Sequence, residues 1–231
     1  MALYAISDLH LALNTDKPMD VFGKQWVDHD EKIRENWLNK INKNDTVLIG
    51  GDISWGMKQE DSKDDLEWIH NLPGTKFLIR GNHDYWWSGI SKLNKMYDDM
   101  KFIQNNFFTY KDWAICGSRG WICPGSDKFN IEKDEKIYSR EQIRLRLSLD
   151  EAKKAGYKNI ICMIHYPPTN EKFEPSAFTE IFEEYGVKKV IYGHLHGITP
   201  FHKIINGEKN GIEYILTSSD FLQFNPIKIL D

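Results

Sequence analysis

The sequence predicts an α/β fold in which two mixed β-sheets pack as a sandwich flanked by helices. Three observations lead to this prediction. Short apolar runs recur along the chain, amphipathic stretches lie between them, and two further stretches have the pattern of short strands without helices. A length of 231 residues and a hydrophobic share of 41% suit one large folded domain, so we expect residues 1–231 to form a single domain.

Five apolar runs have the length and composition of buried strands. Their nearly continuous hydrophobicity is typical of strands that are covered on both faces of a sheet. The predicted strands are Leu3–Ser7, Thr46–Ile49, Lys76–Ile79, Asn159–Ile164 and Lys188–Tyr192.

Amphipathic segments separate these strands. Ile33, Trp37 and Ile41 follow one another at four-residue steps, which places them on one face of a helix. A second segment opens with acidic residues and stops before a Pro-Gly pair, and a third carries repeated Ile and Leu before Gly156. Helices are therefore expected over residues 29–41, 61–70 and 134–155.

Two stretches break the alternation of strand and helix. Residues 101–117 contain polar turn signals that divide them into three short strands. In residues 201–230, Asn-Gly pairs at 206–207 and 210–211 bracket a hairpin, and Pro226 precedes a last short strand. Antiparallel strands beside parallel ones would make both sheets mixed.

Composition and charge exclude several classes of protein. The net charge of −4 argues against a protein that coats polyanions, and the modest clustering of Lys and Arg gives no reason to expect a long nucleic acid as partner. No apolar run approaches the ~20 residues that span a bilayer, so we expect no membrane partner. Cys116, Cys123 and Cys162 are an odd set without paired spacing, which favours reduced thiols and a cytoplasmic location.

Residues capable of chemistry follow all five predicted strands. Because ligand sites gather at the carboxyl ends of strands in α/β sheets, we expect these residues to meet at one edge. An Asp-x-His or a Gly-Asp alone is a weak signal, but clusters at five strand ends are much stronger. The residues are Asp8 and His10 after the first strand, Asp52 after the second, Asn82 and His83 after the third, His165 after the fourth, and His194 and His196 after the fifth.

Carboxylate oxygens, imidazole nitrogens and amide oxygens together suit a borderline or hard divalent ion. Mn, Fe, Zn and Ni all stay open, with Mn as the first choice. Calcium would need more oxygen ligands, and a structural zinc site would need thiolates. Seven candidate ligands are too many for one tetrahedral ion. They suit two ions that share one carboxylate, and such a pair ~3.5–4 Å apart can clamp a phosphoryl group during displacement.

The five motifs resemble, in order, those of the calcineurin-like metallophosphoesterases. The resemblance runs from Leu3 to Gly197 and implies a helix-flanked β-sandwich with a dinuclear metal centre that hydrolyses a small phosphomono- or phosphodiester. The motifs are Asp8-x-His10, Gly51-Asp52, Gly81-Asn82-His83-Asp84, His165 and Gly193-His194-x-His196.

The resemblance also implies a role for each residue. A metal-bridging hydroxide would attack phosphorus, and His83 would protonate the leaving oxygen as general acid. One ion would be held by Asp8, His10 and His196, the other by Asn82, His165 and His194, and Asp52 would bridge the two.

The sequence departs from the protein serine/threonine phosphatases, which carry a second Asp and an Arg soon after the bridging Asp. Both are absent from the segment 51–56, so we do not expect a phosphoprotein substrate. Arg119 beside Trp121 is a candidate for binding a nucleotide-type ester by charge and stacking. The alternative is a surface arginine beside a core tryptophan, and core packing is also the simpler interpretation of Trp86 and Trp87.

Several alternatives stay open at this point. Asp84 either orients His83 or caps a helix that begins near Tyr85. His29 and His202 could reach the site, although each is more simply a loop or helix-start histidine. A non-catalytic scaffold of the same fold would usually lack a ligand or the catalytic histidine. All eight positions are occupied here, so we favour an enzyme over a scaffold or a nuclease.

Overall fold

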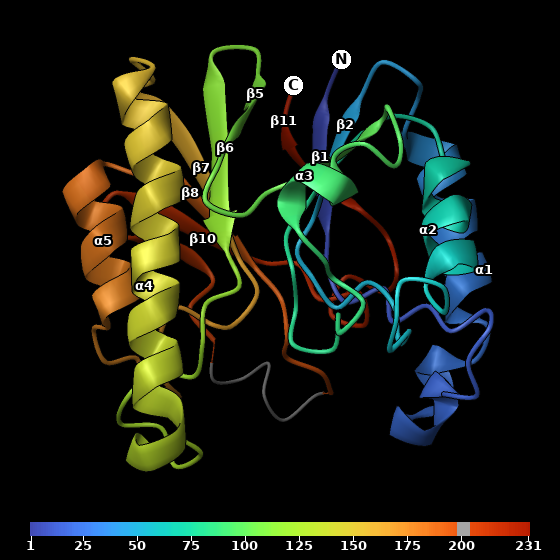
Figure 1. Ribbon diagram of the computed structural model, residues 1–231, viewed down its shortest axis with the longest axis horizontal. Helices are drawn as coiled ribbons and strands as arrows, with labels where there is room; N and C mark the ends of the chain where they lie inside the picture. Colours follow the sequence, from blue (N-terminus) through green and yellow to red (C-terminus); the bar gives the residue numbers. More distant parts are fainter. Residues whose placement is uncertain (198–203) are drawn as a thin grey trace.

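The structure is a computed structural model that describes residues 1–197 and 204–231, so His202 lies outside the described residues. Two sheets pack face to face and helices cover their outer faces, which gives four layers (Figure 1). The first sheet has the order β11-β1-β2-β3-β4, formed by Ile227–Leu230, Leu3–Ile6, Thr46–Ile49, Thr75–Leu78 and Met100–Phe102. The second has the order β5-β6-β7-β8-β10-β9, formed by Phe108–Tyr110, Trp113–Ser118, Asn159–Ile164, Lys189–Tyr192, Ile212–Leu216 and Gly207–Lys209.

Both sheets are mixed, which confirms the predicted fold class. In the first, β1 to β4 are parallel and β11 runs antiparallel to β1. In the second, β6, β7, β8 and β10 are parallel, while β5 and β9 are antiparallel edge strands. The carboxyl ends of the parallel strands therefore lie at the same end of the sandwich, the lower end in Figure 1.

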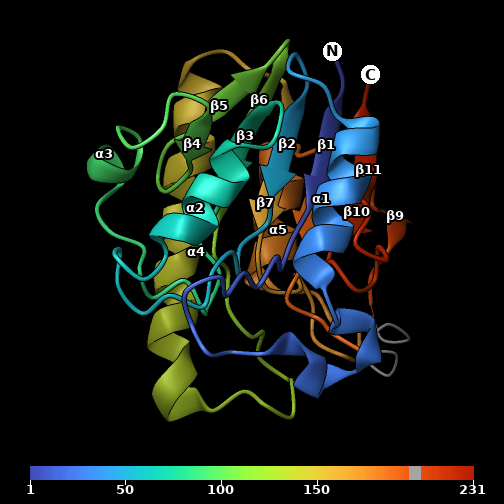
Figure 2. The ribbon, with the colours of Figure 1, turned by 90° about the vertical axis from the view of Figure 1, so that its right-hand side faces the viewer.

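Helices α1 and α2 cover the first sheet, and α4 and α5 cover the second (Figures 1 and 2). The three predicted helices are present, but α4 begins at Ile131 because the Asn130 side chain accepts a hydrogen bond from the Lys133 amide. Helix α5 was not predicted. The helices are α1 (His29–Lys40), α2 (Lys63–His70), α3 (Ile90–Leu93), α4 (Ile131–Lys154) and α5 (Ala177–Tyr185), with 3-10 turns at Met19–Phe22 and Lys24–Trp26.

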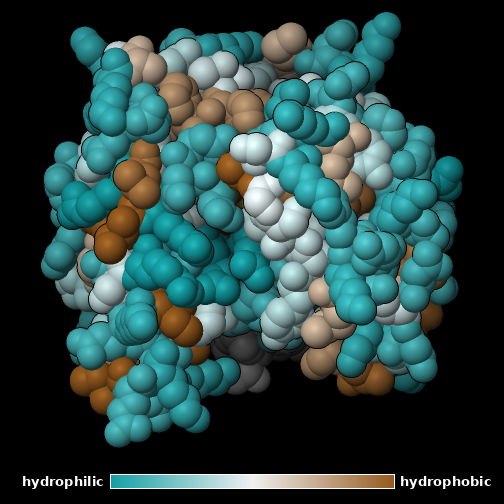
Figure 3. All heavy atoms as spheres, in the orientation of Figure 1, coloured by the Kyte–Doolittle hydropathy of each residue, from teal (hydrophilic) through white to brown (hydrophobic). Residues whose placement is uncertain are grey.

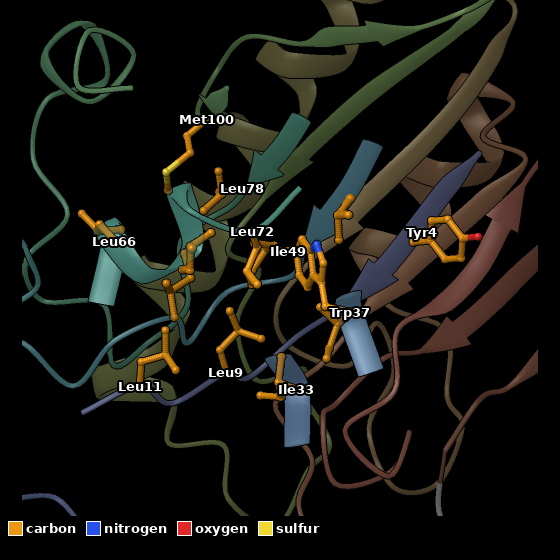
Figure 4. Close-up of a cluster of buried hydrophobic side chains, with 14 of the residues drawn as sticks. Tyr4, Leu9, Leu11, Ile33, Trp37, Ile49, Leu66, Leu72, Leu78 and Met100 are labelled. Atoms are coloured by element: carbon orange, nitrogen blue, oxygen red, sulfur yellow. The ribbon is translucent and has the colours of Figure 1, made fainter. Parts of the chain in front are cut away.

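Three buried clusters hold the layers together. Side chains alternate along each strand, so that Leu3 and Ala5 of β1 enter the cluster between the sheets while Tyr4 and Ile6 face the helices. Figure 4 shows part of the cluster on the helix side of the first sheet, where Trp37 of α1 lies beside Ile49 of β2. A third cluster joins α4 and α5 to the second sheet. Since residues between the sheets are almost fully buried, the sheet-to-sheet spacing is fixed by packing.

The two ends of the chain lie side by side, because β11 pairs with β1 through Leu3 and Leu230 (Figure 1). On the face shown in Figure 3, hydrophobic residues form separate small groups among hydrophilic ones. No helix in the described ranges is long and apolar enough to span a membrane.

Candidate metal centre

The first group of candidate ligands comprises Asp8, His10 and His196, whose ligand atoms lie close enough together to hold a metal ion. The Nε2 atoms of His10 and His196 are 3.2 Å apart, and Asp8 Oδ1 is 3.5 Å from His196 Nε2. Burial raises the pKa of Asp8, but the neighbouring imidazole of His196 outweighs it and leaves the pKa below its usual value. An ionised carboxylate therefore faces two imidazoles.

The second group comprises Asp52, His165 and His194, and it too could hold a metal ion. His165 Nε2 lies 3.3 Å from Asp52 Oδ2 and 3.3 Å from His194 Nδ1. The Oδ1 atom of Asn82 lies 2.9 Å from the same nitrogen. Asp52 Oδ2 is also 3.9 Å from Nε2 of His10, so this carboxylate lies between the two groups.

The atoms around His165 fit a cation. Its Nδ1 lies 2.9 Å from the Gly50 carbonyl oxygen, which can only accept, so Nδ1 carries a hydrogen. Nε2 then faces acceptor oxygens of Asn82 and Asp52. A metal ion would satisfy all of these atoms at once. Without one, a second proton on the ring is favoured: burial opposes it, but the Asp52 carboxylate raises the pKa of His165 to about 9.

Burial also acts on the other imidazoles. It is the main cause that lowers the pKa of His10 to about 4 and of His194 to about 3. Both rings are therefore neutral at pH 7, which is the state in which an imidazole nitrogen binds a metal. The buried Nδ1 of His10 has no hydrogen-bond partner among the described residues.

The backbone is strained at the candidate ligands. Asp8, His10, Asp52 and His194 have φ angles of 60°, 47°, 50° and 73°, in the left-handed region that costs non-glycine residues ~1–2 kcal/mol each. Strain of this kind persists only where surrounding structure imposes it, and it gathers at functional sites. The four residues are thus held in sharp turns that aim their side chains inward.

Two motif glycines are required by close approach rather than by chain flexibility. A Cβ on Gly81 would collide with the carboxylate of Asp52, and one on Gly193 would collide with that of Asp8. The amide of His194 donates to both oxygens of Asp8, at 2.9 and 3.1 Å. The loops after β3 and β8 therefore pack directly against the two carboxylates.

Asp220 belongs to the site, although the sequence analysis missed it. Its Oδ1 lies 3.0 Å from Nδ1 of His196, and its Oδ2 accepts from the Gly197 amide at 2.8 Å. The contact orients the His196 ring with Nε2 toward Asp8 and His10. Burial opposes protonation, but Asp8 and Asp220 raise the pKa of His196 to about 10. The sequence signal that could have identified Asp220 is its position shortly after β10, a strand that runs parallel to β8.

Asp84 has neither of its two predicted roles. Its buried carboxylate accepts from the amides of Ile53 at 2.9 Å, Ser54 at 3.2 Å and Gly81 at 2.7 Å, and from the Trp86 indole at 3.0 Å. It joins the loop after β2 to the loop after β3 and so fixes Asp52. Burial and the Asp52 carboxylate raise the pKa of Asp84 to about 6. Helix α3 begins later, after Gly89.

His83 lies at the rim of the site and is half-buried. Its amide donates to Asp52 Oδ1 at 2.8 Å, and its ring packs on Trp55 with the centroids 4.3 Å apart. Burial lowers the pKa of the ring. Within the described ranges its ring nitrogens have no hydrogen-bond partner.

Other predicted residues have clear positions. The Arg119 guanidinium lies 4.5 Å over the Trp121 ring and 3.4 Å from Glu141 of α4. A substrate-binding role for Arg119 stays a prediction. Trp86 and Trp87 are core residues. His29 is structural, since its Nε2 lies 3.0 Å from the Leu9 carbonyl.

A two-sheet sandwich that gathers two His/Asp groups at one end of its parallel strands has the architecture of a metal-dependent hydrolase. The chain belongs to the calcineurin-like phosphoesterase family, whose model matches residues 1–197. This confirms the predicted family and gives the class of activity as phosphohydrolase. The family is one of dinuclear metal enzymes, and the two groups of this chain could hold two ions.

The chain is also similar to a phage protein and to solved structures. The Gene 66 protein of Mycobacterium phage D29 is 27% identical over 191 residues, covering 82% of this chain and 76% of that protein. The solved phosphopantetheinyl hydrolase of Mycobacterium tuberculosis has a TM-score of 0.62 at 12% identity, covering 99% of this chain and 95% of that one. A protein of unknown function from Aquifex aeolicus has a TM-score of 0.54 at 18% identity, covering 98% and 95%. At these identities the solved structures show a shared fold.

If Asp220 orients His196 for a metal, Asp220→Ala should weaken binding of one ion by about 10–100-fold and leave the other unchanged. Titration calorimetry with Mn²⁺ would measure the two affinities. Asp112→Ala is the matched control, because Asp112 is exposed and bonds only the Asn159 side chain among the described residues. Unchanged affinity for both ions in the Asp220 variant would show that the contact is not needed for metal binding.

Proposed function

We propose that this protein is a metal-dependent hydrolase of a small phosphomono- or phosphodiester. The observation that carries the proposal is the position of Asp52, between two His/Asp groups at the ends of both sheets. Such an arrangement supports two ions with a shared carboxylate ligand. Membership of a phosphoesterase family supports the reaction type.

In this proposal each candidate ligand keeps the role that the family resemblance implies. Two divalent ions, with Mn²⁺ as first choice, would activate water at neutral pH and offset charge on the phosphoryl oxygens. The chain supplies the ligands in two sets joined by one carboxylate. Asp8, His10 and His196 would hold one ion, Asn82, His165 and His194 the other, and Asp52 both.

His83 is the proposed general acid. Its ring lies 5.8 Å from that of His10 between centroids, and its own amide is bonded to Asp52, so it sits beside the metal ligands without being one. Packing on Trp55 limits its rotation. From this position the protonated form of the ring, which its lowered pKa makes the minor form at pH 7, would pass its proton to the leaving oxygen, which would otherwise depart as an alkoxide.

We further propose that residues 1–231 form one domain of a cytoplasmic protein. The family match ends at residue 197, but β10 and β11 complete the two sheets and Asp220 supports His196. The three cysteines are free and buried, which suits a reducing compartment.

The direct test is hydrolysis of p-nitrophenyl phosphate and bis-p-nitrophenyl phosphate, with added Mn²⁺ and with chelator. We expect turnover that the chelator abolishes and Mn²⁺ restores, since the proposed nucleophile depends on the ions. The ratio of the two rates gives the monoester or diester preference. Absence of turnover in protein that holds two ions would favour the alternative, a non-catalytic scaffold.

His83→Ala should retain both ions but lower kcat by about 10²–10⁴-fold for esters with poor leaving groups. The loss should be smaller for p-nitrophenyl esters, because p-nitrophenolate leaves without protonation. Steady-state kinetics on alkyl and p-nitrophenyl esters would show the difference, with metal content measured in parallel. Equal losses on both kinds of ester would argue against the acid role.

A further inference from the structure

A cavity of about 340 Å³ opens beside the second group of candidate ligands. Its walls are the loop after β6 (residues 122–128), the loop after β7 (residues 166–171), and His194 with Leu195 after β8. His194 belongs both to this wall and to the ligand group around Asp52, so the cavity borders the proposed reaction site.

Apolar and neutral side chains form most of the inner wall. Ile122, Cys123, Pro167 and Leu195 line it beside Tyr166. Cys123 is buried, and burial raises the pKa of its thiol to about 12, so it is uncharged at pH 7. The cavity is large enough to take an organic group of ring size beside a phosphoryl group at the metal ligands.

Aromatic packing holds this wall in place. The Tyr166 ring is buried with its centroid 4.1 Å from that of His194 and 5.0 Å from that of Trp121. The Trp121 indole donates to Asp134 of α4 at 3.0 Å. A wall that is already fixed loses little entropy when a ligand binds, so it can discriminate by shape.

The charges at the rim disfavour an anionic occupant. Three charged side chains line the cavity: Lys128, Asp127 and Glu171. Glu171 accepts a hydrogen bond from the Asp127 amide at 2.8 Å, which lowers the pKa of its carboxyl. The charged side chains of the lining are therefore two acids and one base, and they offer a polyphosphate or an oligonucleotide no net positive charge.

A second cavity, of about 390 Å³, lies within residues 12–30. Its lining includes none of the candidate metal ligands and contains Asp16, Asp20, Asp28 and Asp30. We therefore use this second cavity for a control substitution and do not propose it as a substrate pocket.

We propose that the cavity beside His194 binds an uncharged, ring-sized organic group attached to the substrate phosphate. This proposal rests on the proposed function. The substrates would then be phosphate esters of uncharged, ring-bearing alcohols, rather than polyphosphates or nucleic-acid chains. This names a class of substrate that the metal ligands alone do not specify.

The test uses two phosphonates that cannot be hydrolysed, phenylphosphonate and methylphosphonate, titrated into the full chain loaded with Mn²⁺. We expect phenylphosphonate to bind about tenfold more tightly or better, because the ring leaves water for an apolar wall. Ile122→Trp should fill the cavity and abolish this preference. Ser126→Trp, in the same loop, adds a ring to the cavity from a different position and serves if the first variant does not fold.

Val27→Trp, in the cavity of residues 12–30, is the matched control and should keep the preference. Equal binding of both phosphonates by the unmodified protein would overturn the proposal, as would a preference that persists in a folded cavity variant. Hydrolysis is measured separately. A preference for phenylphosphonate without turnover of any ester would support the cavity and count against the hydrolase, so the two proposals can fail independently.

Discussion

The site depends on one buried carboxylate, that of Asp52, which faces imidazoles from both sheets. Its Oδ2 lies 3.3 Å from His165 Nε2 and 3.9 Å from His10 Nε2, while its Oδ1 accepts from the His83 amide. A carboxylate buried in this way is stable only if it stays paired. The pairing is secured by Asp84, which fixes the loop around Asp52 through three backbone amides. A cation shared by these groups would complete the balance of charge.

The sandwich architecture is what brings the partners of Asp52 together. The first sheet supplies Asp8, Asp52 and Asn82, and the second supplies His165 and His194. The distances between these side chains are therefore set by how the two sheets pack, and the cluster between the sheets is almost fully buried. Packing over many residues offsets the ~1–2 kcal/mol that each left-handed ligand residue costs. The packing that stabilises the core thus also sets the geometry of the site.

Much of this arrangement was predictable from local signals. The strands are apolar runs that end in polar motifs, and parallel strands align those ends, so convergence of the motifs follows from the fold class. Asp220 was missed because it follows Ser218-Ser219 without a recognisable motif. Its contact with His196 appears only in the tertiary structure. Helix α5 was missed because its capping box has Thr179 where Glu or Gln is usual. The role of Asp84 depends on amides from two loops, which no local pattern reveals.

We propose above that two metal ions share Asp52 as a ligand. Anomalous scattering from crystals soaked with Mn²⁺ tests it most directly, because it locates each ion without reference to activity. We expect two peaks on either side of Asp52, one beside Asp8, His10 and His196 and the other beside Asn82, His165 and His194. A single peak at saturating Mn²⁺, or two peaks of which only one contacts Asp52, would contradict it.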